Sequence, residues 1–263
     1  MRVLVTNDDG VEAPGLRALA CAIADVGHDV VVVAPAGERS GSGAAIGRLH
    51  RSGPIPWTPV VWPDRPGISV HAHEAPPAAT VYAGCMGAFG PAPDVVASGV
   101  NPGMNYGHLV LHSGTVGAAL TARELGIPAV AVSIAWGDEE HFDTAAMIAT
   151  DAVEWIATQS GAPMVANINV PNVALEHVRG VRGAKLCRFT ERWSAETTPG
   201  ELHLEYVGHG TQFDPDSDLA VVSSGAAAVT LLEGVAQVAG NATVPARALA
   251  RALDTRVMCR GVA

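Results

Sequence analysis

Apolar runs alternate with helical patterns along the first two thirds of the chain. RVLVTN (2–7) is a continuous apolar run of the kind that forms a parallel strand covered on both faces. Apolar positions then repeat at helical spacing from residue 16 to 23, and Gly27 supplies a stop before the apolar run DVVVVA (29–34). The pattern predicts a βαβ unit with a right-handed crossover.

The same alternation continues to about residue 170. It predicts three further strands and two further helices: strands at 94–98, 129–134 and 164–170, and helices at about 115–125 and 143–158. We therefore expect an α/β fold with a Rossmann-like, doubly wound, mainly parallel sheet and helices on both faces. Folds of this class bind ligands at the carboxyl ends of their strands.

One segment interrupts this core. Between about 50 and 90 the Pro and Gly content rises, and SVHAH (69–73) alternates like an edge strand or a hairpin arm. We expect a hairpin-like insertion within a core spanning 1–171.

The chain changes character after this core. Short β-like pieces such as GELHLEYVG (200–208) and AAAVTLL (226–232) follow, and an Ala/Arg-rich helix is expected near 244–254. Residues 172–263 are thus predicted to form a smaller, partly β extension that is used in oligomerisation.

Composition narrows the classes of function. Of 263 residues, 48% are hydrophobic and 16% charged, which is typical of a globular protein; a formal charge of −10 argues against a nucleic-acid polymer as partner. No apolar run is long enough for a bilayer, and the first residues lack a signal-peptide pattern, so we expect a cytoplasmic protein without a membrane partner. Four well-separated cysteines are expected to be buried thiols: Cys21, Cys85, Cys187 and Cys259.

Polar groups follow the predicted parallel strands. Asp8 and Asp9 come after the first, GERSGSG (37–43) after the second and SGVNPGMNYG (98–107) after the third, while HSGTVGAA (112–119) enters a helix. Because these loops gather at one sheet edge, they can build a single site.

Two adjacent carboxylates at the end of a buried strand repel each other unless a cation lies between them. Hard cations such as Mg²⁺ or Mn²⁺ take carboxylate and neutral oxygen ligands, and Ser40 and Asn101 supply a hydroxyl and an amide oxygen. The alternative, which the sequence leaves open, is a strand-end turn in which Asp8 and Asp9 cap the following helix.

Ser113, Gly114 and Thr115 directly precede an apolar helix, so their hydroxyl and N–H groups suit a phosphate. An ordinary helix N-cap is the alternative. Farther along, His108 and His112 are substrate-side candidates within an expected loop.

Three other interpretations fit less well. His71 and His73 share a strand face and could bind a metal, but an exposed hairpin is expected there. The glycines from Gly41 to Gly47 follow the second strand with the wrong spacing for a dinucleotide fingerprint. A phospho-accepting receiver domain needs an Asp where this chain has Asn101.

Taken together, TNDDGVEAPG, ERSGSG, SGVNPGMNYG and HSGTVGAA resemble the SurE family, the survival-protein 5'/3'-nucleotidases. The match continues through INVPN (168–172) and SDLAVVSSGAAAVTLL (217–232), so it covers about residues 1–232.

The resemblance implies a metal-dependent phosphomonoesterase that hydrolyses nucleoside 5'- and 3'-monophosphates with one Mg²⁺ or Mn²⁺ per subunit, assembled as a homodimer or homotetramer. The implied metal ligands are Asp8, Asp9, Ser40 and Asn101. The implied substrate contacts are Gly41, Asn105, Ser113, Gly114 and Thr115. Asp8 or Asp9 is the implied catalytic group that orients or deprotonates water.

One residue and two segments depart from the family pattern. Glu12 stands where the family has His, EAPPAAT (74–80) lacks the usual Thr-Pro step and acid, and AAIG (44–47) replaces a polar run. Two alternatives therefore remain: a diverged member acting on another phosphomonoester, and a non-catalytic phosphometabolite-binding protein.

Overall fold

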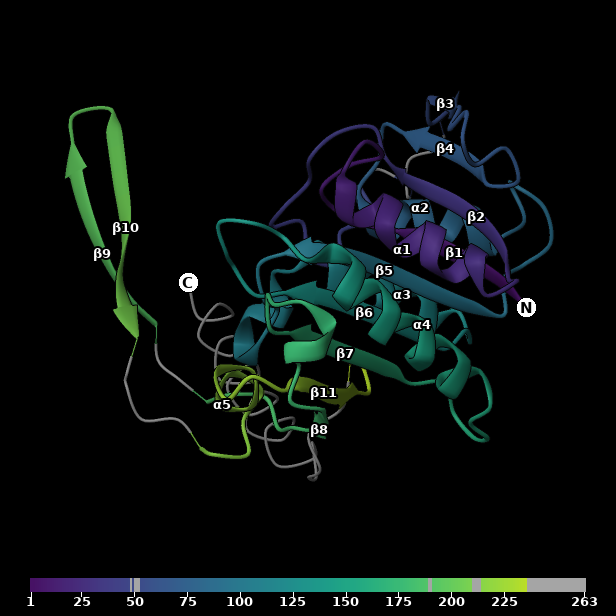
Figure 1. Cartoon of the computed structure of the whole chain (residues 1–263). Coiled ribbons are helices and arrows are strands. Elements are labelled where there is room, and N and C mark those ends of the chain that lie inside the picture. The colour runs from purple at the N-terminus through teal and green to yellow at the C-terminus, as the bar shows by residue number, and fades with distance from the viewer. Residues whose placement is uncertain (48, 50–52, 189–190, 210–213, 236–263) are drawn as a thin grey trace, which may run out of the picture.

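A nine-stranded, mostly parallel sheet forms the centre of the computed structural model, which describes residues 1–47, 49, 53–188, 191–209 and 214–235 (Figure 1). From one edge to the other the strands are β3 (Trp57–Val60), β4 (Ser69–His73), β2 (Asp29–Pro35), β1 (Arg2–Thr6), β5 (Val95–Pro102), β6 (Ala129–Ile134), β7 (Val165–Val170), β11 (Ala227–Leu232) and β8 (Val181–Gly183).

The central strands form where the sequence is continuously apolar. β1, β2, β5, β6 and β7 are buried along most of their length, and β1 pairs in parallel with both β2 and β5. Val-rich runs suit this position because β-branched side chains pack on both faces of a pleated strand. The predicted α/β, doubly wound, mainly parallel fold is confirmed.

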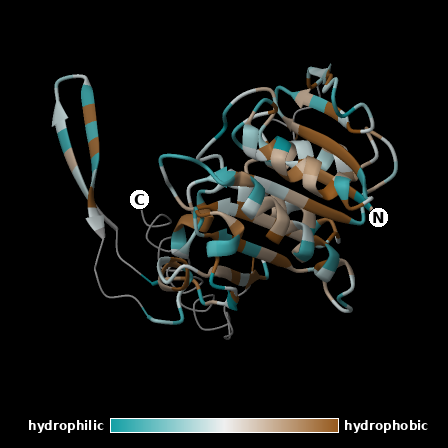
Figure 2. Cartoon of the chain, viewed as in Figure 1, coloured by the Kyte–Doolittle hydropathy of each residue, from teal (hydrophilic) through white to brown (hydrophobic). Residues whose placement is uncertain are grey.

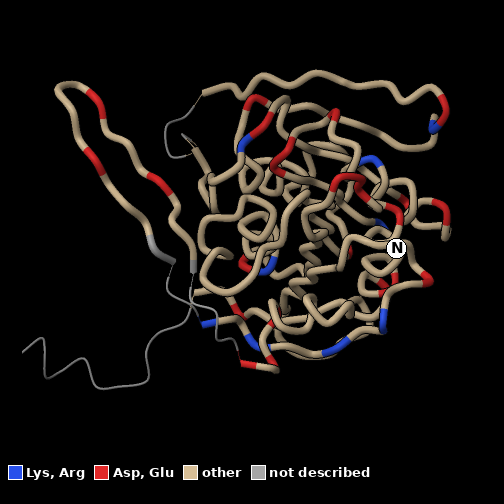
Figure 3. Tube along the Cα trace, turned by 60° about the vertical axis from the view of Figure 1, so that its left-hand side comes forward, with Lys and Arg blue, Asp and Glu red and all other residues tan. Residues whose placement is uncertain are grey.

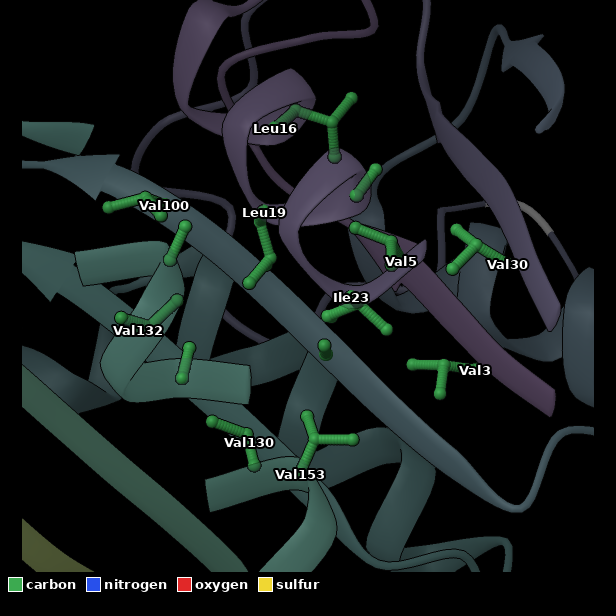
Figure 4. Packing of buried hydrophobic residues seen from close by; sticks show 14 of the residues in the cluster. Val3, Val5, Leu16, Leu19, Ile23, Val30, Val100, Val130, Val132 and Val153 are labelled. Carbon is green, nitrogen blue, oxygen red and sulfur yellow. The ribbon is translucent and has the colours of Figure 1, made fainter. Parts of the chain in front are cut away.

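Helices cover both faces of the sheet. α1 (Pro14–Asp25) packs beside α4 (Phe142–Ala157) on one face, and α2 (Pro77–Cys85) packs beside α3 (Gly114–Glu124) on the other. The predicted stripe on α1 is buried: Leu16, Leu19 and Ile23 pack against strand valines (Figure 4). Burying such side chains stabilises the fold by roughly 1.5–3 kcal/mol each.

The strand order changes direction at β1. The chain passes from β1 to β2 on one side of the sheet and returns to β5 on the other side of β1. The loop after β1, which contains Asp8 and Asp9, therefore lies at a topological switch point, where the loops at the carboxyl edge leave room for a ligand.

The insertion contains β3, β4 and α2. β4 is not an edge strand, because it pairs with β2 in parallel and with β3 in antiparallel; the edge is β3. β3 and β4 pair in antiparallel, as the two arms of a hairpin do, but the exposure expected for His71 and His73 is wrong. His73 is only 4% exposed, because it packs edge-on against Phe89, and His71 is half-buried and stacks on the same ring.

Strands from beyond residue 171 complete the main sheet. β11 pairs with β7 in antiparallel and with β8 in parallel, and short helices flank them: η2 (Leu175–His177) and α5 (Asp218–Ser223). The division of the chain at 171 stays a prediction, and the helix expected near 244–254 lies outside the described residues. Among the described helices none is long and apolar enough to span a membrane.

β9 (Glu191–Thr198) and β10 (Glu201–His209) form a separate antiparallel hairpin that projects from the body (Figures 1 and 3). Hydrophobic and hydrophilic bands alternate along β10 (Figure 2). Because side chains on a strand alternate between faces, one face of this hairpin is apolar.

Candidate active site

The turn after β1 is fixed by Asn7. Its Nδ2 donates to the Gly10 carbonyl oxygen at 2.9 Å, and the Gly10 N–H donates to Asn7 Oδ1 at 3.2 Å. Gly10 has a φ of +107°, which a residue with a side chain rarely adopts. The turn thus presents Asp8 and Asp9 at the carboxyl edge of the sheet.

Asp8 meets the N-terminus of α3. Its Oδ1 accepts a hydrogen bond from Thr115 Oγ1, and the N–H groups of Gly114 and Thr115 also donate to its carboxylate. Asp8 is 3% exposed, and this burial raises its pKa although the hydrogen bonds oppose the shift.

Asp9 lacks a comparable set of donors. Its Oδ2 is buried without a hydrogen-bond partner. The pKa of Asp9 is raised to about 7. Burial is the largest cause, and repulsion from Asp8 and Glu38 adds to it. The carboxylate pair therefore needs a positive charge to stay ionised together.

Asn101 is directed toward this pair by a β-bulge. The β5–β6 register shifts between Ser98 and Asn101. Asn101 was expected in the loop after the strand, but it lies within β5. Its Nδ2 donates to the Gly103 carbonyl oxygen at 2.6 Å, and its Oδ1 lies 3.3 Å from Thr115 Oγ1. The amide oxygen therefore lies next to the hydroxyl group that binds Asp8.

The 37–43 loop is tied to the same place. The Arg39 N–H donates to the Asp8 carbonyl oxygen at 2.6 Å, and the Gly43 N–H donates to the His112 carbonyl oxygen at 3.1 Å. Ser40 is exposed on this loop, with its N–H donating to Glu38 Oε1 at 2.9 Å. No hydrogen bond within the described residues joins the Ser40 hydroxyl to Asp8 or Asp9, so its role as a ligand stays a prediction.

Ser42 is a site residue that the sequence did not single out. Its Oγ is buried without a partner, and a Cβ placed at Gly114 would lie 2.8 Å from it and 2.7 Å from Asp8 Oδ2. Gly114 therefore lets the start of α3 approach both side chains. ERSGSG offers two serines, and nothing in their spacing indicates which one is buried.

The predicted phosphate turn has two kinds of contact. Ser113 Oγ accepts the Val116 N–H at 3.1 Å, which is the N-cap that the sequence left open, and Thr115 is engaged with Asp8. Gly41 has open space around it on the neighbouring loop. The N–H groups at the start of α3 therefore face the same region as the acids.

Asn105 belongs to a buried polar network. Its Nδ2 donates to Ser133 Oγ at 2.8 Å, its N–H donates to Asn169 Oδ1 at 2.8 Å, and its carbonyl oxygen accepts from Asn167 and Asn169. This network fixes the loop after β5 to β6 and β7.

Asp218 holds the other end of that loop. It is fully buried and accepts the N–H groups of Gly107, Cys187 and Leu219 at 2.8–2.9 Å. The segment 107–111, expected as a loop, is a short 3₁₀ helix, η1 (Gly107–Leu111). His108 is exposed on η1, and His112 is exposed directly after it. No hydrogen bond or ion pair among the described residues joins either imidazole to Asp8 or Asp9.

The residues present fit a hard divalent cation. No cluster of three or more His, Cys, Asp or Glu side chains capable of holding a metal exists in the described part of the chain. The donor set here is instead two carboxylates, of which one has an unpartnered oxygen, with an amide oxygen nearby. Carboxylate and neutral oxygens are the ligands that Mg²⁺ and Mn²⁺ prefer.

This α/β fold has a carboxylate pair at its switch point, and a helix N-terminus faces that pair. These features define a class of protein that can bind a cation and a phosphate group next to each other. The chain belongs to the SurE family, because the family model "Survival protein SurE" matches residues 3–196.

Relatives agree over most of the chain. The "5'/3'-nucleotidase SurE" of Serratia proteamaculans (strain 568) is 36% identical over 242 residues, covering 89% of this chain and 90% of that protein. The "5'-nucleotidase SurE" of Synechococcus sp. (strain JA-3-3Ab) is 35% identical over 240 residues, covering 89% and 92%. The crystal structure of the SurE protein from Aquifex aeolicus matches with a TM-score of 0.76 and 28% identity, over 89% of this chain and 93% of that one.

Proposed function

We propose that this chain hydrolyses nucleoside 5'- and 3'-monophosphates with one divalent cation per subunit, Mg²⁺ or Mn²⁺. Relatives at about 36% identity that carry the name 5'/3'-nucleotidase support its assignment as a phosphoric monoester hydrolase. The observation that carries the metal dependence is the buried Asp9 Oδ2, which has no partner beside a second carboxylate.

The cation would be held by Asp8, Asp9 and Asn101, with the Ser40 hydroxyl as the predicted fourth ligand. When bound, a divalent cation offsets the charge of the carboxylates and of the phosphoryl oxygens and lowers the pKa of a coordinated water. Ser42 lies close enough to Asp8 to be tested as an alternative to Ser40.

The two aspartates differ in what they can do. Asp8 already accepts hydrogen bonds from Thr115 and from the start of α3, which fixes its orientation. Asp9 has a free oxygen, so we assign to Asp9 the orientation of the attacking water and the acceptance of its proton.

The start of α3 would bind the phosphoryl group. The positive end of the helix dipole favours negative charge there, and the Ser113 hydroxyl, whose oxygen accepts the Val116 N–H, keeps its proton to donate to a phosphoryl oxygen. The N–H groups of Gly114 and Thr115 already donate to Asp8, so these two residues would support the phosphate through the carboxylate and the helix end. Asn105 fixes the facing loop, and Gly41 leaves space for substrate.

Phosphate release from nucleoside 5'- and 3'-monophosphates, measured with Mn²⁺ and with EDTA, tests the proposal. We expect release that disappears in EDTA and returns with metal, and we expect Asp8→Asn to lose most activity while remaining folded. Equal activity in chelator would overturn metal dependence. Binding in calorimetry without turnover across nucleotides, sugar phosphates and polyphosphate would favour a non-catalytic binding protein, and turnover of sugar phosphates alone would favour a diverged phosphomonoesterase.

Assembly as a homodimer or homotetramer is part of the proposal. The hairpin of β9 and β10 exposes Leu202 (62%) and Leu204 (63%) on a strand that projects from the body. Exposed apolar surface of this kind marks an interface. Analytical ultracentrifugation should show a wild-type oligomer that Leu202→Ser/Leu204→Ser weakens; a wild-type monomer would contradict it.

We also propose a small phosphorylated substrate, no nucleic-acid polymer and a cytoplasmic location. Lys and Arg segments are scattered among the acidic ones and form no continuous basic stretch over the described chain (Figure 3). Cys85 and Cys187 are buried free thiols, and Cys21 is a half-buried one, which suits a reducing compartment. Cys259 lies outside the described residues. Fractionation of cells that produce the protein tests the location.

A further inference from the structure

Trp136 is exposed beside the candidate active site. It lies in the loop that joins β6 to α4, at the carboxyl edge of the sheet (Figure 1). At 77% exposure it is the most exposed of the chain's five tryptophans. So exposed a side chain buries little apolar surface, so packing within the fold does not explain a tryptophan at this position.

The indole is seated on Gly103. A Cβ placed at Gly103 would lie 2.7 Å from the Trp136 ring, and Gly103 has a φ of +111°, so both space and backbone conformation require glycine there. The ring thus rests against the backbone of Gly103, and most of the side chain stays exposed.

The loop that carries Trp136 is held at both ends. The Ala135 N–H donates to the Val170 carbonyl oxygen at 2.8 Å. Gly137 packs so tightly against the Asn172 amide that a Cβ there would collide with it, and that amide donates to the Glu139 carbonyl oxygen at 2.9 Å. The ring is therefore presented on a fixed backbone.

Gly103 also connects the ring to the acids. Its carbonyl oxygen accepts the Asn101 amide at 2.6 Å, and Asn101 Oδ1 lies 3.3 Å from the Thr115 hydroxyl that binds Asp8. The Trp136 ring and the Asn101 amide therefore contact the same residue, Gly103, and Asn101 connects that residue to Thr115 and Asp8.

We propose that Trp136 stacks on the base of a nucleoside monophosphate whose phosphate lies at Asp8 and Asp9. The inference rests on the proposed function and deepens it by naming a specificity-determining residue. Every base has a π-face, so stacking binds all nucleotides but not a phosphorylated sugar. Stacking acts equally on the bound substrate and on the transition state, so it changes KM more than kcat.

The experiment compares nucleoside 5'-monophosphates with ribose 5-phosphate, which carries the same ester without a base. Trp136→Ala should raise KM for the nucleotides about 5-fold or more, with kcat nearly unchanged and with ribose 5-phosphate unaffected. Trp136→Phe should restore most of the difference. Trp155→Ala, which removes a 45% exposed tryptophan from α4, is the matched control and should change nothing.

Outcomes separate the two proposals. An active enzyme whose Trp136→Ala variant keeps the wild-type KM for nucleotides, or loses affinity for ribose 5-phosphate equally, overturns the stacking role alone. Absent turnover overturns the hydrolase proposal, and calorimetry then decides the inference: Trp136→Ala must weaken nucleotide binding and leave ribose 5-phosphate binding unchanged.

Discussion

Replacing Asp9 with Asn should stabilise the metal-free protein. In the absence of a cation, the Asp9 carboxylate is buried beside Asp8 and faces Glu38, and its Oδ2 has no partner. Asn keeps nearly the same shape without the charge. The substitution therefore removes a repulsion that folding otherwise has to overcome.

The magnitude follows from the pKa. Folding raises the pKa of Asp9 from 3.8 to about 7. At about 1.4 kcal/mol for each pKa unit, the ionised side chain disfavours the folded state by about 4 kcal/mol at most. Part of Asp9 contacts solvent, which screens the repulsion, so we expect ~2–4 kcal/mol.

The sign fixes the pH dependence. Because folding raises the pKa of Asp9, the folded state favours the neutral side chain. The contribution of neutral Asp9 to the free energy of unfolding is fully present below pH 3.8 and is lost as pH rises through about 7. The advantage of Asp9→Asn over wild type should therefore be largest at pH 8 and much smaller at pH 5.

Urea unfolding in EDTA at both pH values measures this difference. In Mn²⁺ the order should reverse, because metal stabilises only the protein that binds it. Glu176→Gln, at an exposed acid on η2, is the control and should be neutral. Equal stability of wild type and Asp9→Asn in EDTA at pH 8 would refute the reasoning about the carboxylate pair.

Three further substitutions probe other parts of the structure. Gly117→Ala would push a methyl group into the Gly43 carbonyl, so calorimetry should show weaker Mn²⁺ binding, whereas Gly37→Ala, in open space, should not; equal affinities would contradict this. Burial lowers the pKa of His73, so stability falls as pH drops below about 6.5, and His73→Phe should flatten that slope in urea titrations at pH 7.5 and 5.5; an unchanged slope would contradict it. Leu19→Ala should cost about 2–5 kcal/mol in urea unfolding, and a loss below 1 would mean that the core is loosely packed.

The fold was largely readable from the sequence because its central strands are continuously apolar. Burial on both faces leaves no alternation along β1, β2 or β6, and Pro14 and Gly27 mark the ends of α1. β11 was predicted as a strand, but its place beside β7 was not, because pairing between segments 57 residues apart depends on tertiary contacts.

The candidate site was only partly readable. Asp8 and Asp9 could be placed, since a residue after a parallel strand always lies at the carboxyl edge. The bulge that turns Asn101 inward, and the burial of His73 against Phe89, depend on neighbouring strands and helices. The sequence did not indicate a role for Trp136, because its contact with Gly103 joins residues that are 33 positions apart.

Close backbone approach is the physical basis of this site. Gly114 and Gly117 let the first turn of α3 reach Asp8 and the 37–43 loop, and side chains at either position would push the helix away. That approach removes water from the carboxylates, and the same loss of water raises the pKa values of Asp8 and Asp9. A site built in this way is unfavourable without a cation and strengthens the attraction to one, because charges in a dry environment interact strongly. Metal affinity and metal-free instability should therefore change together in any variant that loosens α3.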